Sequence, residues 1–85
     1  MLLEDNIEQS VKAIIANILQ IPIDEIKLED TLFFDLPCSD NDIIEVAMMI
    51  EEEFGIEISD EDFLIIQAGK IRNIIELIKE QLSPK

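Results

Sequence analysis

The 85-residue chain carries 20 Asp and Glu against 6 Lys and Arg, which gives a net charge of −14, and it contains no His, Trp or Tyr. A chain of this length builds one domain, residues 1–85, around one core. Without His there is no imidazole general base, no Ser/His or Cys/His pair and no ordinary zinc site. We therefore expect neither an enzyme nor a metal centre. The negative charge repels nucleic acid and anionic lipid, and it favours a basic protein surface as the partner.

The cellular setting is expected from three features. The single cysteine, Cys38, cannot form an intramolecular disulfide. No apolar run approaches the roughly 18 to 20 residues that span a bilayer, and the acidic start lacks the basic residues of a signal peptide. We expect a soluble cytoplasmic monomer without membrane insertion. The charge alone does not separate a partner-binding surface from one that serves only solubility.

The first element is a helix, because apolar residues repeat at helical spacing from about Asp5 to Gln20. Asp5 or Asn6 can cap it, and Glu8 suits its first turn. Pro22 prevents continuation much beyond Gln20.

The next stretch, residues 21–39, keeps neither a helical nor a strand period for long. Loops of this length inside a compact domain are uncommon, and they are usually functional or pinned by their own side chains. Here the apolar side chains favour a long loop anchored to the core by Ile21, Ile23, Ile26, Leu28, Leu32, Phe33, Phe34 and Leu36.

The second helix is expected to span about Asp40 to Phe54. Ser39, with Asp42 three residues later, is a relative of the capping box, and Gly55 is a typical C-terminal stop.

Two further helices complete the chain. Ser59 and the acidic residues after it open a short third helix that runs to about Ile66. Gly69 interrupts the chain before a final helix from about Lys70 to Leu82. No strand pairs are apparent. The pattern predicts an all-α, small four-helix bundle with a long loop between helices one and two and a short third helix.

The second helix has two different faces at 100° per residue. Its buried side is expected to hold Ile43, Val46, Ala47, Ile50 and Phe54. Its outer side gathers Asn41, Ile44, Glu45, Met48 and Glu52. Two large apolar side chains therefore lie among carboxylates. Either the long loop or the third helix covers Ile44 and Met48, or they form a recognition face to which the acidic ring steers a basic partner.

The order of elements and several residues together resemble the acyl carrier protein family. The matching segments are residues 32–36 (L-F-F-D-L), 42–46 (D-I-I-E-V) and 50–61, which include E-E-E-F. Family members read F-x-x-D-L-G-x-D-S-L-D, then an acidic helix, E-E-E-F and I-P-D-E. The resemblance covers nearly the whole chain. It implies a bundle of acyl-carrier type that docks on basic-surfaced enzymes of fatty acid, polyketide or peptidyl metabolism, acyl-transferring or acyl-condensing, through Asn41, Ile44, Glu45, Met48 and Glu52.

The resemblance also implies a prosthetic group, because the serine of the family's D-S-L receives 4′-phosphopantetheine from coenzyme A. Here the tripeptide is Ser39-Asp40-Asn41, so Asp40 occupies the serine position, with the register fixed by Asp35-Leu36 before it and the E-E-E-F run after it. A carboxylate would give a labile mixed anhydride, and we expect no 4′-phosphopantetheine at Asp40. As a first-turn carboxylate it is stabilised by about 0.3 to 1 kcal/mol.

Three alternatives near this position are disfavoured. Ser39 as the acceptor conflicts with its use as N-cap and with the rotation of about 100° per residue. Cys38 as a direct acyl carrier has no Lys, Arg or His nearby to lower its pKa. A calcium loop around Asp35 and Asp42 lacks the required glycine and glutamate. The alternative function is a non-loaded regulatory or adaptor protein that uses the same acidic helix.

Overall fold

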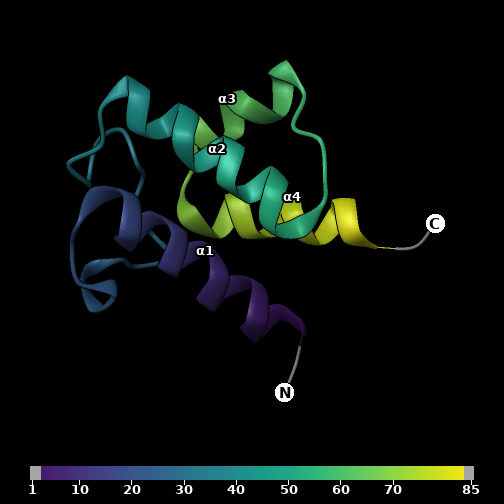
Figure 1. The fold of residues 1–85 in the computed structure, drawn as a ribbon, viewed down its shortest axis with the longest axis horizontal. Helices are drawn as coiled ribbons and strands as arrows, with labels where there is room; N and C mark the ends of the chain where they lie inside the picture. The colour runs from purple at the N-terminus through teal and green to yellow at the C-terminus, as the bar shows by residue number, and fades with distance from the viewer. Residues whose placement is uncertain (1–2, 84–85) are drawn as a thin grey trace.

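The structure is a computed structural model that describes residues 3–83, which form four α-helices and one short 3-10 helix (Figure 1). In chain order they are α1 (Leu3–Leu19), the short 3-10 helix η1 (Ile23–Glu25), α2 (Asp40–Phe54), α3 (Asp60–Ala68) and α4 (Ile71–Leu82). Within the described range, the only β-type pairing is an isolated antiparallel bridge between Thr31 and Lys70. The predicted all-α bundle is confirmed. None of the helices in this range is long and apolar enough to cross a membrane.

The core is aliphatic and lies where the helices meet. α1 packs against both α2 and α4, and α3 contacts α2 and α4 from the other side (Figure 1). Branched side chains repeating at helical spacing fill this space, which is why the three long helices can be predicted clearly from the sequence. The buried side chains are Ile7, Val11, Ile14, Ile15, Ile26, Leu32, Ile43, Val46, Ala47, Ile50, Ile66, Ile71, Ile74, Ile75, Leu77 and Ile78.

The helix ends follow the expected signals at α2 and differ slightly elsewhere. Ser39 caps α2, and Gly55 ends it with a left-handed φ of 64°. α1 begins at Leu3, so the prediction that Asp5 or Asn6 caps it is wrong. Both residues lie inside the helix. Asp and Asn are weak helix formers, but they do not end a helix that other residues stabilise. α3 extends two residues past Ile66 to Ala68.

The final helix also starts one residue later than predicted. Lys70 is its N-cap, and α4 proper begins at Ile71. The side chain of Asn73 closes this start by accepting a hydrogen bond from the Lys70 amide at 3.0 Å.

The long loop is pinned to the start of α4. The amides of Ile71 and Arg72 donate to the carbonyls of Asp30 and Leu28 at 2.9 and 3.0 Å. Glu29 forms ion pairs with both Lys70 and Arg72. The hydrogen bond from Lys70 is the largest cause of the lowered pKa of Glu29. These contacts fix the path of the loop along the start of α4.

Only part of the predicted set of loop anchors is correct. Ile26 and Leu32 are buried, and Ile21, Leu28 and Leu36 are half-buried against the core. Ile23, Phe33 and Phe34 are exposed, so their prediction as anchors is wrong. A loop has no fixed period, and its turns decide which side chains face inward.

Candidate functional site

The turn before α2 is fixed by a hydrogen-bond cluster between Thr31 and Asp35. The Asp35 carboxylate accepts from the Thr31 amide at 2.8 Å and from the Thr31 hydroxyl at 3.1 Å. The same hydroxyl accepts from the Phe34 amide at 3.1 Å. Leu32 and Leu36 pack inward on the two sides of this turn. The chain therefore enters α2 from a defined direction.

The first residues of α2 form a complete capping box. The Ser39 hydroxyl accepts from the Asp42 amide at 3.2 Å, and the Asp42 carboxylate accepts from the Ser39 amide at 3.1 Å. Ser39 thus has the N-cap role predicted for it. Asp40 and Asn41 are exposed in the first turn, where the positive end of the helix dipole favours the Asp40 carboxylate.

Cys38 lies beside this cap and is half-buried against the core. Burial, followed by the negative charges of Asp42 and Asp40, raises the pKa of the Cys38 thiol to about 11. The thiol is therefore protonated at neutral pH. Because the thiolate is the nucleophilic form, this cysteine is poorly suited to carry an acyl group.

The outer face of α2 is open to solvent. Ile44 is 47% exposed and Met48 is 57% exposed, so the interpretation in which the loop or α3 covers them is wrong. The accompanying polar residues are also exposed: Asn41, Glu45 and Glu52. On the opposite side, the predicted core residues of the helix are buried, with Phe54 half-buried. α2 therefore presents apolar contact area within a ring of carboxylates.

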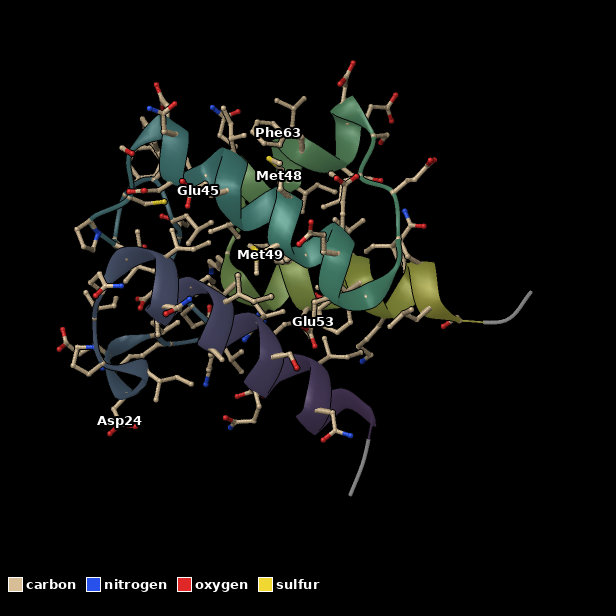
Figure 2. All side chains as sticks on the ribbon, in the orientation of Figure 1. Asp24, Glu45, Met48, Met49, Glu53 and Phe63 are labelled. Carbon is tan, nitrogen blue, oxygen red and sulfur yellow. The ribbon has the colours of Figure 1, made fainter. Side chains whose placement is uncertain are left out.

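Two neighbouring surfaces extend this face (Figure 2). Met48 lies on the side of α2 toward α3, where Figure 2 places Phe63. Met49 was not among the residues predicted from the sequence to lie on the outer face. It is 39% exposed on the side toward α1. There, with Glu45, it lines a shallow groove against Ala13 and Asn17.

Exposed apolar residues of α3 were also missed. Leu64 and Ile65 are exposed, whereas Ile66 is buried and Phe63 is half-buried. A signal for them exists in the sequence. Four consecutive apolar residues on a helix, turning 100° each, cannot all face one core.

The three glutamates at the end of α2, residues 51–53, have different roles. The Glu51 carboxylate accepts a hydrogen bond from the Ile58 amide at 2.8 Å and so ties the α2–α3 connection to the helix. Glu52 and Glu53 are exposed. Of the three, these two are available to a partner.

The charge around this surface has one sign. No Lys or Arg occurs between Lys27 and Lys70, a segment that includes the turn, α2 and α3. The cations of the described residues lie on α1, near η1 and at α4. The carboxylates on and near α2 thus have no counter-charge within their own segment and create a negative potential over this half of the molecule.

Comparisons with protein families and with curated proteins both give matches. A family model described as a phosphopantetheine attachment site matches residues 9–78. The acyl carrier protein of Buchnera aphidicola subsp. Schizaphis graminum (strain Sg) is 47% identical over 58 residues, which cover 68% of this chain and 73% of that protein. The range matched by the family model includes α2 and the turn before it.

Proposed function

The chain belongs to the acyl carrier family with a phosphopantetheine attachment site, and from this membership we propose that it docks on basic-surfaced enzymes of acyl metabolism through α2, without 4′-phosphopantetheine at Asp40. The family's cofactor is 4′-phosphopantetheine. Family members carry acyl groups and do not catalyse reactions, and we expect no catalysis by this chain. Enzymes of fatty acid, polyketide or peptidyl metabolism are the expected partner class.

The observation that carries the docking proposal is the exposure of Ile44 and Met48 among Glu45 and Glu52. The carboxylates would steer a Lys- and Arg-rich surface toward α2 and raise the association rate. Ile44 and Met48 would then supply the desolvated contact area, and Met adapts to differently shaped partners. Both kinds of contact are needed, because charge alone gives little affinity at physiological salt.

The proposal that Asp40 stands in the place of the attachment serine depends on register. The Asp35-Leu36 pair precedes the site and Asp42 follows it, both at the spacing that the family's motif has around its serine. The residues present do not fit the prosthetic group. Asp40 has no hydroxyl, Ser39 uses its hydroxyl oxygen as N-cap, and the thiol of Cys38 is protonated.

A second candidate function is a regulatory or adaptor protein that never carries cargo. The missing hydroxyl at Asp40 favours it. Both candidates use the same face of α2, so docking does not separate them, whereas loading at any residue of the chain would exclude the adaptor.

Docking is tested by reversing charge on α2. The partners are a purified phosphopantetheinyl transferase, an acyl-transferring enzyme and an acyl-condensing enzyme from the source organism, with affinity measured by isothermal titration calorimetry. We expect Glu45→Lys combined with Glu52→Lys to raise the Kd about tenfold or more for each enzyme that binds the wild type.

The matched control is Asp24→Lys combined with Glu25→Lys, which changes the net charge equally. Asp24 lies on the far side of α1 from α2 (Figure 2). The control is expected to change the Kd by less than about threefold. If the α2 variant binds as tightly as the wild type, docking through this face is wrong.

A further inference from the structure

Phe33 and Phe34 form an exposed aromatic pair directly before α2. Their exposed fractions are 51% and 76%, and Phe34 is the most exposed large hydrophobic residue in the described part of the chain. The ring centroids are 4.8 Å apart at an interplanar angle of 83°, an edge-to-face contact. The rings thus stabilise each other while most of their surface faces solvent.

Buried neighbours and hydrogen bonds fix the backbone of this pair. Leu32 is fully buried before it, Leu36 packs on the core after it, and the Phe34 amide is bonded to the Thr31 hydroxyl. The Asp35 carboxylate closes the turn onto Thr31. A partner that binds the rings would therefore lose little conformational entropy in ordering them. Rigid, central aromatic side chains are typical hot spots of protein interfaces.

The charge near the pair selects the kind of partner. Asp30, Asp35 and Asp40 flank it in sequence, and the two cations that the loop meets at the start of α4, Lys70 and Arg72, are both paired with Glu29. A second copy of the chain is a poor occupant, because each copy carries a net charge of −14. A pocket that is apolar inside and rimmed by Arg or Lys complements both features. Arginine at such a rim also gains from contact with an aromatic face.

We propose that the Phe33–Phe34 pair is an anchor that enters an apolar, Arg- or Lys-rimmed pocket on the same enzyme that α2 contacts. This inference rests on the proposed function and adds to it a second contact, outside α2. Residues 35–39 alone connect the pair to the first residue of α2. A single partner surface can therefore reach both.

The test uses the same purified enzymes and titrations. Phe33→Ser combined with Phe34→Ser is expected to raise the Kd about thirtyfold, the effect of losing a hot spot. The matched control is Ile23→Ser, an exposed apolar residue of the same loop, for which a change below about threefold is expected. Circular dichroism and thermal melting check folding. The single variant Phe34→Ser keeps the test valid if the double variant unfolds, because Phe34 is the more exposed residue.

The outcomes separate this inference from docking through α2. If the Phe variants bind like the wild type while the Glu45 and Glu52 variant is weakened, the anchor is wrong and docking through α2 stands. If only the Phe variants are weakened, docking through α2 is wrong, and so is the proposal that α2 and the pair contact the same enzyme. Absence of binding to every enzyme overturns both. Dimerisation of the wild type in sedimentation equilibrium that is abolished by Phe34→Ser would show a second copy as the occupant and overturn the anchor.

Discussion

Cys38 lies next to the capping serine of α2, between the core and the carboxylates of Asp40 and Asp42. Its environment stabilises the neutral thiol over the thiolate, since burial and two negative charges act in the same direction. Because the thiolate is disfavoured in the folded state, the stability of the fold is highest below pH 9.0, the ordinary pKa, and falls as the pH rises toward about 11.

The raised pKa predicts a slow reaction of Cys38 with a disulfide reagent such as DTNB at pH 7.5. The thiolate fraction falls about a hundredfold for two pKa units, and the greater nucleophilicity of the more basic thiolate recovers about a factor of ten. We expect the native protein to react about tenfold more slowly than the urea-unfolded chain. Asp40→Asn should speed the native reaction. A native rate equal to the unfolded rate would contradict this account of the thiol.

At the level of single residues, the sequence predicted the helical positions well and the loop positions poorly. Ile44, Glu45 and Met48 are exposed, as expected for a recognition face, because helical spacing assigns a face to each residue. Phe33 and Phe34 face solvent although they are apolar. Their direction depends on the hydrogen bonds of Asp35 with Thr31, which no periodicity predicts.

At the level of elements, α2 is the best predicted, since its end signals act locally. Ser39 with Asp42 and the left-handed Gly55 are short-range features, and both bounds of the helix agree with the prediction. The start of α1 and the first residue of α4 were predicted less accurately. The position of Ile71 depends on its hydrogen bond to Asp30, a contact between distant parts of the chain.

The two glycines predict different responses to substitution. Gly55 has a φ of 64° and open space where a Cβ atom would lie, whereas at Gly69 a Cβ atom would lie 2.5 Å from the Ile65 carbonyl oxygen. We expect Gly55→Ala to lower the free energy of unfolding by about 1 kcal/mol through backbone strain. Gly69→Ala is expected to lower it by about 1 to 3 kcal/mol through the steric clash.

Asparagine variants separate these two causes in urea denaturation. Gly55→Asn should recover much of the loss, because Asn tolerates the left-handed region. Gly69→Asn should not, because any Cβ meets the same carbonyl oxygen. Wild-type stability of Gly69→Ala would contradict the close approach between Gly69 and the last turn of α3.

At the scale of the whole molecule, the positively charged residues are confined to one group of elements. α2, α3 and the turn before α2 carry only acidic charged residues, and the cations of the described residues lie on the side of α1 and α4. This division could be predicted from the sequence once the order of helices was known. The attachment of the long loop to α4 could not, because Glu29 is far from Lys70 and Arg72 in the chain. The result is a molecule in which the charged side chains of α2 and α3 are all acidic.

We propose that the chain keeps the docking face of α2 while Asp40, at the attachment position, cannot accept the prosthetic group. The most direct measurement is the intact mass after incubation with coenzyme A and a broad-specificity phosphopantetheinyl transferase. The wild type is expected to gain no mass, and Asp40→Ser is expected to gain one phosphopantetheinyl group under the same conditions. A conventional acyl carrier protein serves as the positive control. A gain of one such group by the wild type, abolished by Ser39→Ala, would contradict the account and identify Ser39 as the attachment residue.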